Sequence, residues 1–253
     1  MEYSLFNAAH LITLGIFALM GVVFFFLVTK LKQSEAWKER IFQILAIFNF
    51  IVHISIVWYL FITKDSIFVI PFNLLWPLAT CNIVVFFNLV ICVMNKQSKV
   101  FKFIAAFCVW MGIIGGVLSL LAGKTGPVDF DNVRSLFSHF IMILTSTYIF
   151  IAGYVKISVN NLFPVAAGLV FNGLLGFVTN WIFYLKGWAD QNAMWLHDGL
   201  IPGVAATRGY YVALYALAII FIFTAIYEQI KLKKGSRWYN RLANFFKAKS
   251  DKG

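Results

Sequence analysis

The sequence predicts an all-α protein, a polytopic membrane bundle of seven transmembrane helices. Hydrophobic residues make up 61% of the 253 positions and charged residues only 12%, whereas about a quarter of residues are charged in a soluble domain. Runs of roughly 20 apolar residues, the length that crosses a hydrocarbon core, recur along the whole chain. Lysine and arginine also gather in alternate connections, which predicts an N-terminus outside and a C-terminus in the cytoplasm.

The apolar runs predict seven spans, at residues 9–29, 41–62, 68–94, 101–122, 135–155, 161–185 and 209–229. The first run has no basic region before it, so we expect a retained helix rather than a signal peptide. Sixteen of the 21 lysines and arginines follow the first, third, fifth and seventh spans. This side is therefore predicted to be cytoplasmic.

The chain divides into a seven-helix transmembrane domain, 1–230, and a basic tail, 231–253. The tail alternates lysine and arginine with aromatic residues, which predicts an amphipathic segment on the anionic inner leaflet. A solvated tail is the alternative. Most of the lysines and arginines behind the net charge of +11 lie on the predicted cytoplasmic side, as in other membrane proteins. We therefore expect no nucleic-acid partner. The predicted location is the cell membrane, as a multi-pass protein of a bacterial plasma membrane.

The third span is the stretch around which a site is predicted. Proline kinks a helix, and polar side chains in hydrocarbon usually face a bundle interior or a wet cavity. The first half of this span holds both kinds of residue: Pro71, Asn73, Pro77, Thr80, Cys81 and Asn82. This pattern predicts a pocket around Cys81.

A nucleophile and its base are the functional interpretation of this pocket. At 1.5 Å per helical residue, Cys81 lies roughly 20 Å and His139 roughly 25 Å from the cytoplasmic end of their spans. His10 stands at the outer end of the first span. A thiol attacks a carbonyl as the thiolate and needs a base to take its proton. The alternative is that Cys81 is a small packing residue.

Other polar residues are predicted to complete the site. Ser135 lies one turn before His139 and can fix the orientation of its ring. Possible donors to an oxyanion are Thr80, Asn82, Asn73 and Asn180. Cys92 and Cys108 are expected to be packing residues, and with no CxxC motif we predict neither a disulfide framework, a metal site nor a cofactor.

Three further features each leave two interpretations open. His53 shares a helical face with Asn49 and either serves the site or bonds between helices. Of the two asparagines of the sixth span, we expect Asn172 to bridge helices and Asn180 to line the cavity.

Gly112 and Gly116 have the spacing of close helix packing, which we expect within the chain rather than in a dimer. The apolar outer loop 187–208 is expected to lie back on the bundle.

The ordered set of motifs resembles the YwaF-like integral membrane proteins, the transmembrane protein 164 family. The matching stretches are FNAAHLITL with His10, WPLATC with Cys81, WMGIIGGVLSLL, SLFSHFIMIL with His139, and FVTNWIFYLKGWADQNAMWL with Asn180, Asn192 and Trp195. They cover most of the chain. At Ala79 the chain departs from the family pattern, in which histidine is common, so His10 or His139 would serve alone.

The resemblance implies a multipass acyltransferase or lipid hydrolase, because a eukaryotic member is regarded as a cysteine-dependent phospholipid acyltransferase. The related androgen-induced hydrolases use a threonine and a histidine, which makes Thr80 the second choice of nucleophile. We therefore expect an enzyme acting on acyl lipid near the outer leaflet, with Cys81 as nucleophile, His139 as base and His10 assisting. The alternatives are a small-molecule carrier or receptor without catalysis, and an assembly subunit.

Overall fold

The computed structural model describes residues 2–3, 6–30, 33–64, 79–122, 126–187, 192–196 and 204–250, and it confirms an all-α membrane bundle. A two-residue strand β1 (Glu2–Tyr3) pairs antiparallel with β2 (Gly126–Pro127). Short 3-10 turns are η2 (Val159–Asn161), η3 (Ala193–Trp195), η4 (Ala205–Thr207) and η5 (Lys234–Ser236). The helices are α1 (Ala8–Lys30), α2 (Glu35–Lys64), α4 (Thr80–Cys92), α5 (Lys99–Ala122), α6 (Phe130–Ile151), α7 (Leu162–Leu185), α8 (Gly209–Lys231) and α9 (Trp238–Ser250).

Within the described ranges, six helices are long and apolar enough to cross a membrane, which makes this a multi-pass membrane protein. They are α1, α2, α5, α6, α7 and α8. The third span, 68–94, which its prolines predicted to be broken in the first half, is not one continuous helix: the backbone of Ala79 is extended (φ −128°, ψ 152°) and α4 begins at Thr80. Pro71, Asn73 and Pro77 lie outside the described residues. Cys81 is therefore a first-turn residue of a 13-residue helix.

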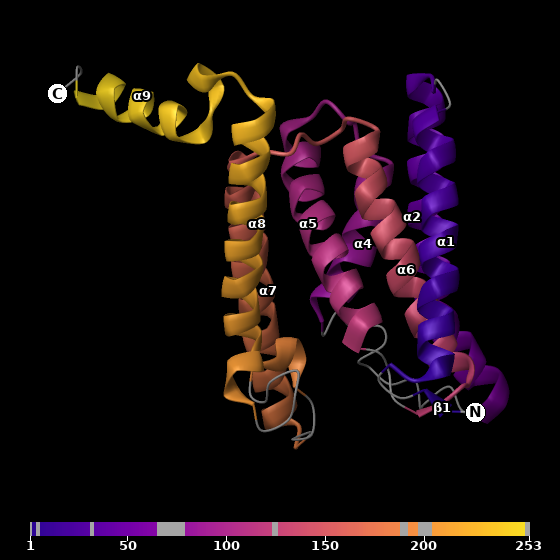
Figure 1. The fold of residues 1–253 in the computed structure, drawn as a ribbon. Helices are drawn as coiled ribbons and strands as arrows, with labels where there is room; N and C mark the ends of the chain where they lie inside the picture. The colour runs from indigo at the N-terminus through magenta and orange to yellow at the C-terminus, as the bar shows by residue number, and fades with distance from the viewer. Residues whose placement is uncertain are drawn as a thin grey trace.

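The spanning helices run up and down along one bundle axis (Figure 1). The connections that follow α1, α4, α6 and α8 meet at one end of the bundle. These are the connections that carry most of the lysines and arginines. At the same end α9 turns sideways from α8 (Figure 1), as a helix lying along a membrane surface would.

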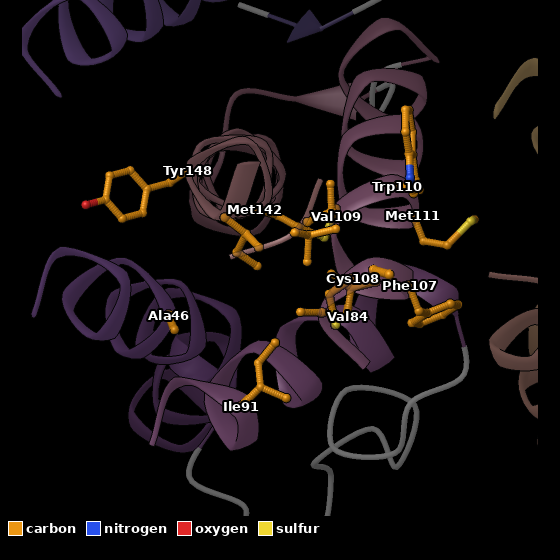
Figure 2. Close-up of a cluster of buried hydrophobic side chains, with 14 of the residues drawn as sticks. Ala46, Val84, Ile91, Phe107, Cys108, Val109, Trp110, Met111, Met142 and Tyr148 are labelled. Carbon is orange, nitrogen blue, oxygen red and sulfur yellow. The ribbon is translucent and has the colours of Figure 1, made fainter. Parts of the chain in front are cut away.

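Helices α5 and α6 form the centre of the bundle, since more than half of the residues in their apolar stretches are buried, whereas less than a quarter are buried in α1, α7 and α8. Their buried side chains pack with those of α2 and α4 in one hydrophobic cluster. Figure 2 shows Val84 of α4, Val109 of α5 and Met142 of α6 within it. This packing holds α4 and α6, which carry Cys81 and His139, against a common partner.

Glycines of α5 allow α6 to approach closely, which confirms packing of Gly112 and Gly116 within the chain. A Cβ atom on Gly112 would lie 2.0 Å from Ser146 Oγ, and one on Gly116 would lie 2.5 Å from Ile143 Cγ1. Only a residue without a side chain fits at such distances.

Gly112→Ala is expected to destabilise the protein by about 1–3 kcal/mol, the usual effect of overpacking. The added methyl group must displace Ser146, whose hydroxyl donates to the Cys108 carbonyl at 3.2 Å. Thermal unfolding in detergent measures the change. Gly115→Ala is the matched control, because a Cβ atom there meets nothing within 4 Å. Equal melting temperatures for the two variants would contradict this packing.

A buried carboxylate joins the tail to the bundle. Glu228 of α8 is fully buried and accepts a charge-assisted bond from Arg241 Nη2 of α9 at 2.9 Å. The same carboxylate accepts from the Ser158 hydroxyl and from the backbone N–H groups of Val159 and Trp238. Pairing and hydrogen bonding of this kind offset the desolvation of a buried charge. The first turns of α9 are therefore docked where α8 ends and α7 begins.

Candidate functional site

A cavity of about 160 Å³ lies between α2, α4 and α6. It brings together four residues that the sequence predicted for one site: Cys81, Asn82, Ser135 and His139. The remaining lining residues are His53, Val85, Arg134, Ser138 and Met142. Cys81 and His139, which come from the third and fifth predicted spans, therefore line one cavity.

Cys81 stands where a helix begins. The extended backbone of Ala79 starts α4, and no side chain caps this end. The first N–H groups of a helix have no partner within it, and they favour negative charge nearby. Cys81 Sγ donates to Asn82 Oδ1 at 3.4 Å. The thiol thus lies beside donors that suit a thiolate or an oxyanion.

The ring of His139 is held in one tautomer. Its Nδ1 lies 2.8 Å from the carbonyl oxygen of Ser135, and a carbonyl only accepts, so Nδ1 carries the proton. In the neutral ring Nε2 is then an acceptor, as a general base requires. Ser135 orients the histidine, as predicted, but through its backbone carbonyl.

Arg134, which the sequence did not predict for the site, also lines the cavity. This arginine is buried, with 8% of its surface exposed. Its Nη1 donates to the His53 carbonyl at 3.0 Å and its Nη2 pairs with Asp131 at 2.6 Å. Its Nε has no hydrogen-bond partner among the described residues. Its position could have indicated a place in the site, because Arg134 precedes Ser135 directly and lies within a turn and a half of His139.

His53 is the second addition to the site. It lines the cavity, and its Nε2 is buried without a hydrogen-bond partner in the described part of the chain. The bond between helices that was the alternative for this face is made by Asn49, whose Oδ1 accepts from Ser138 Oγ of α6 at 3.1 Å. The cavity is thus lined by two histidines and by Arg134, which is paired with Asp131 and keeps an unpartnered Nε–H among the described residues, and the N-terminus of α4 lies beside it. Such a site suits an anionic or electron-rich ligand.

His10 lies elsewhere, at the contact of α1 with the end of α5. The N–H of Phe6 donates to its Nδ1 at 3.1 Å, and its Nε2 donates to the Leu120 carbonyl at 2.8 Å. Both ring nitrogens are therefore engaged, and the side chain is buried. His10 joins two helices and does not line the cavity of Cys81.

A second cavity of about 350 Å³ lies between α5, α7, α8 and the segment Met194–Leu196. Two predicted site residues, Thr80 and Trp195, line it. The hydroxyl of Thr80 lies 3.9 Å from Met194 Sδ. The second-choice nucleophile therefore lines a different cavity from that of Cys81.

The expected roles of the two asparagines of α7 are reversed. Asn180 pairs with the backbone of Ala193, its Nδ2 donating to the carbonyl at 3.1 Å and its Oδ1 accepting from the N–H at 2.7 Å. Asn172 instead lines the second cavity. Ala193 and Met194 are buried, which confirms for 192–196 that the outer loop lies back on the bundle. Asn192 precedes η3 in this segment, whereas Asn73 lies outside the described residues.

In the described ranges, no group of three or more histidines, cysteines and carboxylates is placed to hold a metal ion. No curated protein and no solved structure matches the chain. The model of the TMEM164 family matches residues 5–227, which is most of the chain and extends into α8. Because this match covers far more than half of the sequence, the chain belongs to the TMEM164 family.

Proposed function

We propose that this protein is a membrane-embedded lipid acyltransferase or acyl-ester hydrolase that works through a thioester on Cys81. The observation that carries the proposal is the shared cavity of Cys81 and His139, with Nε2 as the acceptor nitrogen of the histidine. A thiol beside an oriented base is the arrangement that activates a cysteine nucleophile.

The first half of the reaction makes the thioester. His139 Nε2 takes the thiol proton, and Sγ attacks the ester carbonyl carbon. The backbone N–H groups of Thr80 and Cys81, at the start of α4, and the Asn82 side-chain amide are the donors for the oxyanion, since the next two N–H groups donate to the Ala79 carbonyl. As the carbon–oxygen ester bond breaks, the leaving alcohol takes the proton from His139.

The second half regenerates the thiol. An acceptor hydroxyl, an amine or water gives its proton to His139 and attacks the thioester carbonyl. The carbon–sulfur bond breaks and the proton returns to Sγ. A lysolipid or amine acceptor makes the enzyme a transferase, and water makes it a hydrolase.

Arg134 is the group that we assign to an anionic part of the substrate, such as the phosphate of a phospholipid. Arg134→Lys keeps the charge and Arg134→Met removes it, and a charge-assisted hydrogen bond contributes about 1.5–3 kcal/mol. We expect Arg134→Met to raise KM for phospholipid about 10- to 150-fold. Turnover of an uncharged diacylglycerol should fall much less. Equal losses on both substrates would contradict this role.

The distribution of lysine and arginine supports a site in the outer half of the membrane and α9 on anionic inner-leaflet lipids. The composition is rich in Phe, Ile, Lys and Asn, which is typical of an AT-rich bacterial genome. This bias supports a location in a bacterial plasma membrane.

The test of the function is incubation of purified protein with defined phospholipids, followed by mass spectrometry of the lipids. The expected products are a lysophospholipid together with a free fatty acid or an acylated acceptor. Absence of both products with every lipid class would refute the proposal. Ligand-dependent stabilisation that persists in Cys81→Ala, with no covalent adduct in the parent protein, would favour the carrier.

A further inference from the structure

We propose that the second cavity binds a neutral single-chain amphiphile whose hydroxyl group hydrogen-bonds to Asn172. Its volume of about 350 Å³ lies within the range of about 300–1,000 Å³ of small-molecule sites. The inference does not depend on thioester chemistry at Cys81.

Asn172 is the polar group of this cavity that lacks a partner. Only 2% of its surface is exposed, and neither its Nδ2 nor its Oδ1 has a hydrogen-bond partner among the described residues. A buried polar group in this condition is destabilising. A side-chain amide both donates and accepts, so one hydroxyl group, which also does both, satisfies it.

The remaining walls suit a hydrocarbon chain. Leu169, Ala213 and Leu217 are among the side chains that line the cavity, and no charged side chain occurs in its described lining. An ionic headgroup would be left without a partner inside it. The occupant is therefore a lipid with an uncharged polar group.

The occupant enters from the bilayer. Two lining residues, Val170 of α7 and Leu214 of α8, are 62% and 59% exposed on the outer faces of spanning helices. In a membrane these faces contact lipid. Asn180, which bonds the backbone of Ala193 twice, holds the neighbouring wall Met194–Leu196 in place. The cavity is thus walled by a fixed loop and opens toward hydrocarbon.

The experiment uses the full chain in phosphatidylcholine nanodiscs with a photoreactive long-chain alcohol that carries an alkyl diazirine. Mass spectrometry of the peptides should place the label on α7, on residues 192–196 and on α8. Excess 1-dodecanol should compete with the label, whereas dodecane, which has no hydroxyl group, should not.

Asn172→Leu is expected to lower competable labelling roughly tenfold, the effect of one lost hydrogen bond. Asn88→Leu is the matched control, because Asn88 of α4 is also buried with an unpartnered amide but does not line this cavity. It should leave labelling unchanged, and melting temperatures establish that both variants fold. Equal labelling of Asn172→Leu and parent, or label that dodecane displaces as well as dodecanol, would overturn the proposal.

Discussion

Replacing Cys81 by alanine is expected to lower acyl turnover about 10⁴-fold or more, because loss of a covalent nucleophile leaves only binding and oxyanion stabilisation. Lysophospholipid formation by purified protein, followed by mass spectrometry, measures the change. The substitution removes one sulfur atom from a cavity wall, so the variant should keep its fold. Its melting temperature checks this.

Cys92→Ala and Cys108→Ala are the matched controls for that loss. Both thiols are buried in the hydrophobic core, and Cys92 Sγ donates to the Leu89 carbonyl. These variants should lose stability, as truncation in a packed core does, and keep turnover at the level of the parent once folded. If Cys81→Ala retained parental turnover, Thr80 would be the next nucleophile to test.

His139→Gln is expected to lower turnover about 10²- to 10⁴-fold at neutral pH, the usual contribution of a general base. Without the base, only the fraction of thiol that is already ionised reacts. That fraction rises with pH, so the variant should recover activity as the pH increases. A steady-state pH profile of parent and variant measures both effects.

His10→Gln distinguishes between the two histidines of the predicted site. Both ring nitrogens of His10 hold backbone groups of other segments, so the variant should lower the melting temperature. A loss of turnover in the folded His10→Gln variant equal to that of His139→Gln would give His10 a part in catalysis and contradict the assignment of His139 alone.

The spans and the meeting of Cys81 with His139 could be predicted because both follow from one-dimensional quantities. The length of an apolar run indicates whether a helix can cross the membrane. The rise of a helix per residue gives the depth of a residue in the membrane from its position in the run. A break in the third span could be predicted from Pro71 and Pro77. The residue at which α4 begins could not, because an apolar composition does not fix where a helix starts.

The side-chain environment of the site was less predictable. Asn172 and Asn180 lie two turns apart on the same face of α7, and periodicity treats them alike. They differ in their surroundings. Asn180 hydrogen-bonds to the backbone of Ala193, whereas Asn172 lines a cavity. Arg134 was assigned to topology for the same reason, because its burial depends on α2, which is distant in the chain.

Intact-protein mass spectrometry of purified protein incubated with phospholipid tests the central claim most directly. The proposed mechanism predicts an added acyl mass that neutral hydroxylamine removes and that is absent from Cys81→Ala. Such an adduct would establish a thioester at Cys81. No adduct with any lipid class, together with unchanged turnover in Cys81→Ala, would exclude Cys81 from the mechanism.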